Sequence, residues 1–364
     1  MKWLKLKYSF NFDWTIFIIP LILSIFGIVV IYSITYGGTG QHLATNQIVF
    51  LSLGLVLAYI FSRIDYRLFK GLYLILYISV LLLLLLVLFF GDKIFGASRW
   101  IELGFFRLQP SEIFKIVALI ITAKLYSDWK EIDYKKVLLS CLLIFVPIYF
   151  ILKQPDLGTA SVIFITFLTI LFISPVKKIY LIIMLAVFLA SAPIAWKMLK
   201  PYQKQIIEAF INPTSDPRGS GYNVNQAKIA VGSGGLYGKG LGKGTQSQLN
   251  FLPVAHTDFI FAGAAEATGF AGAAFLITLL SILIIRVFVI AKNAKDAFGM
   301  YVAGGIGMMF LFQMLVNVGM NMGIMPVTGI PLPFVSYGGS SMLTNMISIG
   351  ILQSIYLRHK KITF

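Results

Sequence analysis

The chain has 364 residues, of which 58% are hydrophobic and only 12% are charged, and its mean hydropathy is +0.87. Soluble domains carry about 25% charged residues, so this composition excludes a water-soluble globule, and the high apolar content also excludes intrinsic disorder. The 30 Lys and Arg residues are scattered between apolar runs, which argues against a nucleic-acid partner and favours anionic lipid. The single cysteine, Cys141, excludes an intrachain disulfide and a thiolate metal cluster.

Ten apolar runs approach the length of about 20 residues that a bilayer-spanning helix needs. The first follows a basic N-terminus and lacks a small-residue cleavage pattern, so we interpret it as a retained anchor and not a signal peptide. The sequence therefore predicts one all-α polytopic membrane domain over residues 1–364. In chain order, the expected helices are residues 14–36, 46–62, 71–90, 111–126, 137–152, 157–174, 179–199, 258–291, 298–320 and 339–356.

The basic residues of the short loops are distributed unevenly between the two sides of the expected membrane. One side carries eighteen Lys and Arg residues, and the other carries only Lys93, Arg99, Arg107 and Lys153. By the positive-inside rule, both termini are expected in the cytoplasm, which requires an even number of helices. The long connection between the seventh and eighth helices, about residues 200–257, is then extracytoplasmic, and residues 201–210 are expected to form an amphipathic helix on the membrane surface.

Four acidic residues lie at or inside span boundaries, where an ionisable group costs about 2.5 to 3.5 kcal/mol and needs a partner, water or a function. They are Glu112, Asp156, Asp258 and Glu266. Asp258 stands where the long outer connection re-enters the membrane. It is either a helix N-cap residue, favoured by the helix dipole, or a partly desolvated general base for a hydroxyl group. Both interpretations stay open on the residues alone.

The other three acids have structural explanations beside functional ones. Glu112 and Lys115 share a helix face and can neutralise each other, or Lys115 can hold an anionic headgroup while Glu112 fixes it. Asp156 is expected to form a turn and to cap the sixth helix. Glu266 lies two turns below Asp258 on nearly the same face, so it could tune Asp258 or pair with a helix neighbour.

The outer connection has a net charge of +5 between residues 197 and 257 and is expected to attract an anion. Its glycine-rich part, residues 232–244, contains Lys239 and Lys243 and is either a flexible loop or a backbone nest for a phosphate. No nucleotide P-loop, zinc motif or nucleophile elbow occurs in the sequence. Residues 326–341 are too broken by proline and glycine to span the bilayer as a helix, so they are expected to form a pocket wall on the outer side.

Six motifs in a fixed order resemble the SEDS family of bacterial cell-wall proteins, named for shape, elongation, division and sporulation. The likeness covers nearly the whole chain, and the GTQSQ run looks more like the elongation branch than the division branch. One departure is Ala267-Thr268-Gly269 after Glu266, where a second acid is more usual. The motifs are GASRWI at 96–101, QPSEIFK at 109–115, QPDLGT at 154–159, GTQSQL at 244–249, HTDFIF at 256–261 and PLPFVSYGGSS at 331–341.

The resemblance implies a ten-helix peptidoglycan glycosyltransferase in the bacterial cytoplasmic membrane, with its active site facing the exterior. Its implied substrate is lipid II, and its implied partners are a class B penicillin-binding protein that crosslinks the product and other membrane proteins of the elongation complex. The family's essential aspartate corresponds to Asp258. The candidate substrate-binding residues are Arg99, Glu112, Lys115, Asp156, Lys239, Lys243, Gln246, Gln248, His256, Glu266, Ser336 and Ser340.

The expected reaction is attack by the acceptor sugar's 4-hydroxyl on the anomeric carbon of a lipid-pyrophosphate donor, with inversion. Asp258 would be the general base, and Arg99, Lys239, Lys243 or a divalent cation, Mg or Mn, would stabilise the departing pyrophosphate. Three alternatives are a lipid II flippase, a division-type member of the same family and an inert scaffold. A flippase would need polar groups near the bilayer midplane and usually a repeated architecture, which the sequence lacks.

Overall fold

The computed structural model describes residues 12–37, 40–94, 97–102, 104, 107–129, 131–199, 201–211, 220–249, 251–252 and 254–358. In this part of the chain, ten helices have 17 residues or more, and six of them are long and apolar enough to cross a membrane by length and composition alone. The predicted all-α fold is therefore confirmed. The long helices are α1 (Thr15–Thr35), α2 (His42–Arg63), α3 (Arg67–Phe90), α4 (Pro110–Asp128), α5 (Tyr134–Lys153), α6 (Leu157–Ile173), α7 (Lys178–Met198), α11 (Ile260–Lys292), α12 (Ala297–Asn321) and α13 (Gly339–Leu357).

Side chains at the helix starts explain several of these boundaries. Asp133, Asp156 and Asp296 precede α5, α6 and α12, and each carboxylate accepts a hydrogen bond from a backbone N–H of the first turn. Helix α4 begins with Pro110, whose missing N–H is not needed at that position. The expected cap role of Asp156 is confirmed, and the helix ends lie within four residues of those predicted from the apolar runs.

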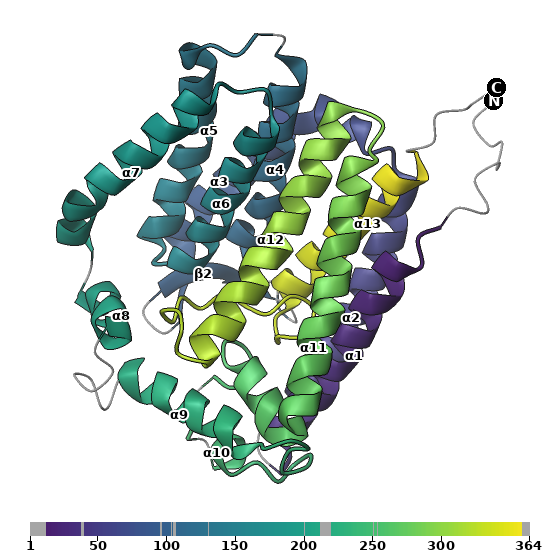
Figure 1. The fold of residues 1–364 in the computed structure, drawn as a ribbon, viewed down its shortest axis with the longest axis vertical. Coiled ribbons are helices and arrows are strands. Elements are labelled where there is room, and N and C mark those ends of the chain that lie inside the picture. The colour runs from purple at the N-terminus through teal and green to yellow at the C-terminus, as the bar shows by residue number, and fades with distance from the viewer. Residues whose placement is uncertain are drawn as a thin grey trace.

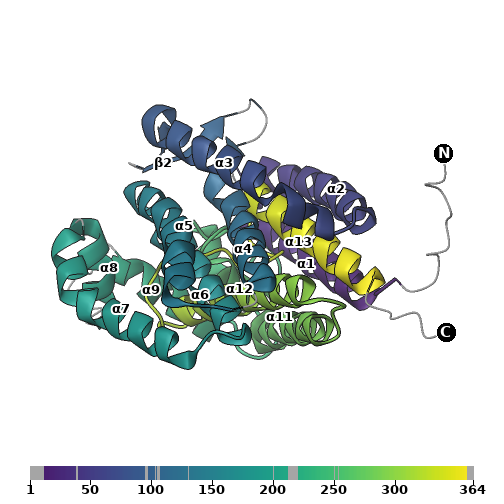
Figure 2. The same cartoon turned by 90° about the horizontal axis from the view of Figure 1, so that it is seen from above.

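Helices α4, α6 and α12 occupy the middle of the bundle, and α7 lies at its edge (Figures 1 and 2). Nearly every side chain of α4 and most of those of α12 are buried. Helix α3, by contrast, exposes much of its apolar surface, including Leu72, Leu74 and Ile75. Because lipid is as apolar as these side chains, packing between such helices depends on close fit more than on hydrophobicity.

Glycines provide that close fit where the segment between α12 and α13 packs against other helices. A Cβ atom at Gly27 of α1 would lie 2.4 Å from the carbonyl oxygen of Val335, and one at Gly158 of α6 would lie 2.6 Å from that of Thr328. Residues 326–338, which connect α12 to α13, have no regular secondary structure in this region. The expected irregular segment is thus confirmed, and it packs directly against helix backbones.

The start of the first long helix, α1, and the end of the last, α13, lie on the same side of the molecule. Arg286 of α11 forms an ion pair with Asp13, just before α1, at 2.6 Å, and it stacks over the ring of Tyr356 near the end of α13. This arrangement is consistent with an even number of membrane crossings between Asp13 and Tyr356.

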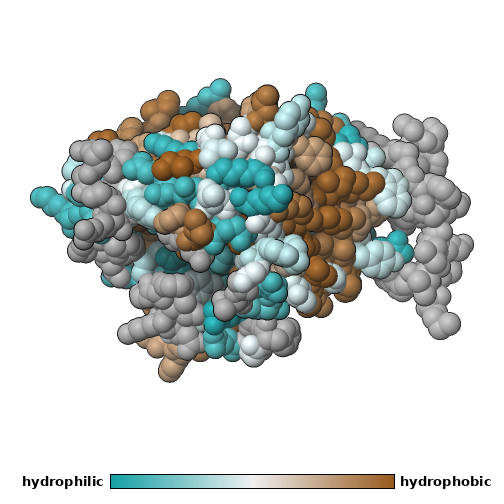
Figure 3. Space-filling model, turned by 90° about the horizontal axis from the view of Figure 1, so that it is seen from below, coloured by the Kyte–Doolittle hydropathy of each residue, from teal (hydrophilic) through white to brown (hydrophobic). Residues whose placement is uncertain are grey.

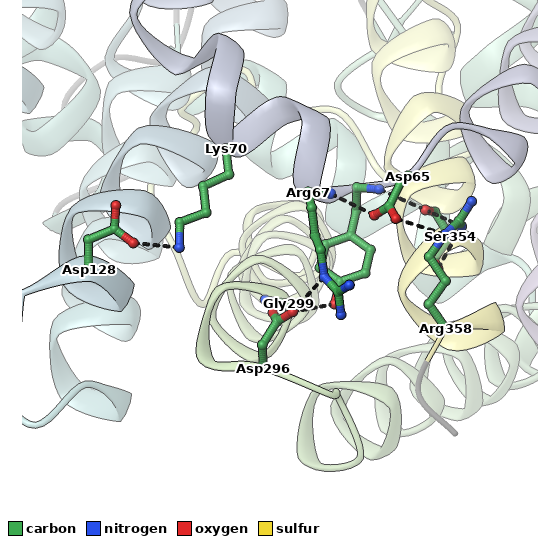
Figure 4. A network of polar contacts seen from close by, with 9 residues as sticks. Asp65, Arg67, Lys70, Asp128, Asp296, Gly299, Ser354 and Arg358 are labelled. Atoms are coloured by element: carbon green, nitrogen blue, oxygen red, sulfur yellow. Dashed lines mark hydrogen bonds and ion pairs between the residues drawn. The ribbon is translucent and has the colours of Figure 1, made fainter. Parts of the chain in front are cut away.

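A polar network holds the α2–α3 turn to α12 and α13 (Figure 4). Asp296 accepts hydrogen bonds from the Tyr66 hydroxyl at 2.7 Å and from Arg67 at 3.0 Å, and Arg358 approaches Asp65. Partial burial opposes ionisation of Asp296, but the donors from Gly299, Tyr66 and Arg67 outweigh it and lower its pKa. Some of the basic residues on this side, such as Arg67 and Arg358, therefore hold the helix ends in place.

The long connection contains three helices, α8 (Pro201–Ile211), α9 (Ser220–Ser233) and α10 (Thr245–Gln248), which lie at the end of the bundle opposite this network (Figure 1). The expected helix at residues 201–210 is confirmed as α8. The sequence did not predict α9, α10 or three short antiparallel strands, β1 (Asp92–Ile94), β2 (Ala97–Glu102) and β3 (Arg107–Leu108). Figure 3 looks onto this end, where hydrophilic side chains gather near the centre.

Residues 234–248, which we call the glycine strap, bind to α11 where that helix is interrupted. Gly269 has φ +70° and ψ −166°, which are not helical values. The next two backbone N–H groups, of Phe270 and Ala271, donate to the carbonyls of Gly235 and Leu236 in the strap, at 2.8 and 3.1 Å. The strap therefore replaces hydrogen bonds that the helix loses at the break.

Glu266 anchors the strap through its buried carboxylate. It accepts hydrogen bonds from the Lys239 ammonium at 3.1 Å, from the backbone N–H groups of Gln246 and Ser247 at 2.9 and 3.0 Å, and from the Ser247 hydroxyl at 2.8 Å. The carboxylate is completely buried, whereas Lys239 is 28% exposed. Because ionised acceptors form stronger hydrogen bonds, this single side chain holds the middle and the C-terminal part of the strap.

We expect Glu266→Gln to weaken the attachment of the strap, since the amide cannot pair with Lys239 and presents N–H groups where the native site needs acceptors. The loss should be about 2 kcal/mol. It can be measured as a lower melting temperature in detergent and as faster proteolysis between α9 and α11. Lys243→Gln is the matched control, because Lys243 is an exposed lysine of the same strap. Equal behaviour of the two variants would contradict the anchor role.

Candidate active site

Asp258 lies in the turn that precedes α11, at the end of the bundle that carries the long connection (Figure 1). The helix begins at Ile260, its N-cap residue is Phe259, and no side chain caps it. The N-cap interpretation of Asp258 is therefore wrong. The carboxylate is only partly buried, and a Cβ atom at Gly329 would lie 3.6 Å from its Oδ2. The absence of a side chain at Gly329 thus leaves space beside Asp258.

The segment before α13 holds the turn that carries Asp258. The Ser336 hydroxyl donates to the carbonyl of Thr257 at 2.7 Å, and the backbone N–H of Tyr337 donates to the carbonyl of His256 at 2.9 Å. The His256 ring meets the Tyr337 ring edge-on at 5.6 Å, and burial lowers the pKa of His256. The expected site residues Ser336 and His256 are thus brought next to Asp258.

Two charged residues influence Asp258 electrostatically, and both come from elements distant in the sequence. Desolvation is the main effect, and it raises the pKa of Asp258 to about 6; the nearby Arg99 opposes this rise, and Asp156 adds to it. Arg99, on β2, donates through Nε to the carbonyl of Gln154 at 2.9 Å and through a terminal nitrogen to that of Pro155. Arg99 is therefore close enough to Asp258 to act on its ionisation.

Both carboxylate oxygens of Asp156 are hydrogen-bonded within the protein. Its oxygens accept hydrogen bonds from the backbone N–H and the hydroxyl of Thr159 and from the Gln109 amide, at 2.9 to 3.0 Å. The backbone N–H of Gln109 in turn donates to Ser340, whose hydroxyl donates to the carbonyl of Arg107. Asp156 and Ser340 therefore lie beside the site as parts of the framework that joins α4, α6 and α13.

Glu112 and Lys115 form an ion pair inside the bundle. The two charged atoms are 2.8 Å apart, and the side chains are 4% and 2% exposed, respectively. The expected pairing on one face of α4 is confirmed. With so little exposed surface, Lys115 has no direct access to a lipid headgroup in this conformation.

The strap residues predicted to bind substrate belong to a second cluster. Lys239 and Gln246 both donate to Glu266, and the Gln248 amide donates to the carbonyl of Ser33 near the end of α1. Glu266 pairs with this strap lysine and not with a helix neighbour. Lys243 is exposed.

Several backbone N–H groups of the strap are bonded within the protein. Those of Lys239 and Gly240 donate to the carbonyls of Glu266 and Ala267, and that of Gly242 donates to Ser33. These three N–H groups are therefore already used, which reduces the number of donors that the strap could offer to an anion.

The described residues around Asp258 form no cluster of side chains that would hold a divalent cation without additional ligands. Among the described residues, no group of three or more His, Cys, Asp or Glu side chains lies close enough to hold a metal. The neighbouring carboxylate of Asp156 is occupied by hydrogen bonds. Mg or Mn held by protein ligands alone would need more oxygen donors than Asp258 provides.

Three buried amides at the site were not among the residues expected from the sequence. Gln47 of α2 donates to the carbonyl of Ser336 and accepts from the N–H of Gly338. Asn317 and Asn321 of α12 both donate to the backbone carbonyl of Asp258, at 3.0 and 3.1 Å. Neutral amides spaced one turn apart in an apolar helix are a signal of buried polar contacts that could have revealed the second pair.

Comparisons with known proteins agree with the motifs. Peptidoglycan glycosyltransferase MrdB of Escherichia coli (strain K12) is 40% identical over 357 residues, which cover 97% of this chain and 95% of MrdB. A chain from the structure "Structural coordination of polymerization and crosslinking by a peptidoglycan synthase complex" has a TM-score of 0.84 at 30% identity, covering 96% of this chain and 99% of that one. The crystal structure of the rod shape determining protein RodA of Thermus thermophilus has a TM-score of 0.73 at 28% identity, covering 96% and 97%.

The family match extends over almost the entire sequence. Residues 13–361 match the family described as "Cell cycle protein", which comprises FtsW, RodA and SpoVE. Together with the apolar helices, the match identifies a multi-pass membrane protein. The resemblance predicted from the six motifs is therefore confirmed, and the chain belongs to the FtsW, RodA and SpoVE family of cell cycle proteins.

Proposed function

We propose that this chain is a peptidoglycan glycosyltransferase that polymerises lipid II into glycan strands during cell elongation, on the outer face of the bacterial cytoplasmic membrane. The observation that carries the proposal is the partly buried carboxylate of Asp258, placed beside Arg99 at the end of the bundle that also carries the long connection. The names of the relatives, MrdB and RodA among them, support the same activity.

Asp258 acts as the general base for the acceptor 4-hydroxyl. With a pKa of about 6 it is mostly ionised at neutral pH, yet it is more basic than an ordinary aspartate. The carboxylate takes the hydroxyl proton while the oxygen attacks the anomeric carbon of the donor. The bond from that carbon to the pyrophosphate breaks, and the α-linked donor becomes a β-linked glycan. A positioned base contributes about 10² to 10⁴ in rate.

Arg99 stabilises the departing pyrophosphate. Its hydrogen bonds to the carbonyls of Gln154 and Pro155 fix the guanidinium plane, and the side chain remains partly exposed. A guanidinium has five N–H groups, so donors are left for phosphate oxygens. We assign this role to Arg99 in preference to Lys239, whose ammonium is held by Glu266. No step of the reaction is assigned to a divalent cation.

The protein works with a class B penicillin-binding protein that crosslinks the new strands and with other membrane proteins of the elongation complex. The similar solved chain belongs to a peptidoglycan synthase complex in which polymerisation and crosslinking are coordinated. The polyprenyl tail of lipid II would remain in the bilayer while its sugars reach Asp258 at the membrane surface.

Replacement of Asp258 by Asn should reduce polymerisation of labelled lipid II by about 10² to 10⁴-fold, because the amide cannot accept the hydroxyl proton. The assay uses the purified protein with its crosslinking partner, and gel filtration checks that the variant folds and still binds that partner. Asp133→Asn is the matched control: Asp133 caps α5, and Asn caps helices equally well.

Surviving polymerisation by folded Asp258→Asn would exclude this residue as the base. A flippase or an inert scaffold predicts no polymerisation by the native protein either, and translocation of lipid II in vesicles would then separate the two. The flippase alternative gains no support from the buried Glu112 and Lys115, which neutralise each other and are almost unexposed.

The pH profile of kcat/KM should report the ionisation of Asp258. Protonation removes the base, so activity should fall as the pH drops through about 6, tenfold per pH unit below that value. An unperturbed aspartate would give a midpoint near pH 4. The profile can be recorded with labelled lipid II between about pH 3 and about pH 8, a range that includes both values. A midpoint near 4 would contradict the partly desolvated base.

Arg99→Gln should move this midpoint to higher pH and also lower kcat. The positive charge of Arg99 favours the ionised carboxylate, so its removal raises the pKa of Asp258 further. Arg107→Gln is the control, because that exposed side chain pairs with Glu102 on the same small sheet and should leave the midpoint unchanged. A shift of the Arg99→Gln profile to lower pH would refute the proposed interaction.

A further inference from the structure

Helix α12 carries two amide side chains, Asn317 and Asn321, one turn apart near its outer end. Both are completely buried. Their spacing places them on the same face of the helix. A buried amide without partners is costly, so the destination of its hydrogen bonds shows what the residue does.

Both amides donate to the main chain of Asp258. Asn317 Nδ2 donates to the carbonyl oxygen of Asp258 at 3.0 Å and to that of Ile330 at 2.8 Å. Asn321 Nδ2 donates to the same carbonyl of Asp258 at 3.1 Å and to the carbonyl of Asn317 at 2.8 Å. One backbone oxygen therefore receives two donors, which uses both of its lone pairs.

The remaining contacts connect these amides to the two segments on either side of the carboxylate. Asn321 Oδ1 accepts from the backbone N–H of Ala262, in the first turn of α11, at 3.0 Å. Such N–H groups have no partner within their own helix. On the other side, Ile330 follows Gly329, which borders the Asp258 carboxylate. The pair thus joins α12 to the turn of Asp258, the start of α11 and the segment before α13.

We propose that Asn317 and Asn321 are positioning residues that clamp the backbone of Asp258 and so fix where its carboxylate meets the acceptor hydroxyl. Neither amide hydrogen-bonds the carboxylate itself among the described contacts, so the pair acts on the position of the base and not on its chemistry. This inference rests on the proposed role of Asp258. A misplacement of about 1 Å can cost about 10²-fold in rate, and it does so in the chemical step more than in substrate binding.

Asn317→Leu, which removes the donor at similar volume, tests the clamp. We expect kcat for lipid II polymerisation to fall by about 30 to 100-fold while KM changes by less than about threefold. Asn317→Ser, which keeps one shorter donor, should recover part of kcat. Melting temperature in detergent and gel filtration verify that each variant is folded.

Gln313→Met provides the matched control. Gln313 lies one turn earlier on α12 and is also completely buried, but neither atom of its amide has a hydrogen-bond partner among the described residues. Its replacement by an apolar side chain of similar shape should leave kcat within about twofold of the native value. An equal loss in Gln313→Met and Asn317→Leu would assign the effect to packing and overturn the proposal.

The outcomes also separate this inference from the proposed function. If Asp258→Asn polymerises lipid II, the proposed base is wrong, whatever the asparagines do. If Asp258→Asn is inactive but folded Asn317→Leu keeps a native kcat, the clamp is refuted and the base stands. If Asn317→Leu does not fold, Asn317→Ser decides: an intermediate kcat at native KM supports the clamp, and a raised KM at native kcat refutes it.

Discussion

The backbone of residues 326–338 crosses the packed bundle without forming a helix, and its buried N–H and C=O groups must find partners inside the protein. Each unsatisfied group costs several kcal/mol in an apolar environment. The polar side chains of the neighbouring helices supply these partners. The Gln47 side chain hydrogen-bonds the backbone of Ser336 and Gly338, and the Asn317 side chain donates to the carbonyl of Ile330. Glycines at positions 27 and 158 let the segment lie directly on helix backbones.

This constraint also accounts for the position of Asp258. The turn that carries it has no regular structure of its own, so it depends on Ser336, Tyr337 and the two asparagines of α12 for its hydrogen bonds. The carboxylate is the one part of the turn that none of these groups holds. It is left beside Arg99, partly desolvated and on the outer side of the framework. A rigid main chain that positions a partly desolvated carboxylate is the arrangement that general-base catalysis requires.

The long helices could be predicted closely from the sequence because apolar runs of fixed length leave few alternatives in a bilayer. Asp156 as a cap and the Glu112–Lys115 pair were also predictable, since both depend on neighbours within four residues. The partners of Glu266 were not, because Lys239 and Ser247 approach it from another part of the chain. Asp258 illustrates the same limit: its position suggested an N-cap, but the helix starts two residues later. Uncharged residues of the site, such as Asn321, are harder to recognise in the sequence than ionisable ones, because a neutral amide in an apolar helix has many possible explanations.

The interruption at Gly269 divides α11 into two mechanical parts. The outer nine residues, from Ile260 to Thr268, are bonded to the strap through Glu266, while the longer inner part continues to Lys292. Because Phe270 and Ala271 donate to the strap, the hydrogen-bond ladder does not run unbroken between these parts. The strap therefore binds directly to the short part of α11 that follows Asp258, and the break at Gly269 separates this part from the hydrogen-bond ladder of the longer part.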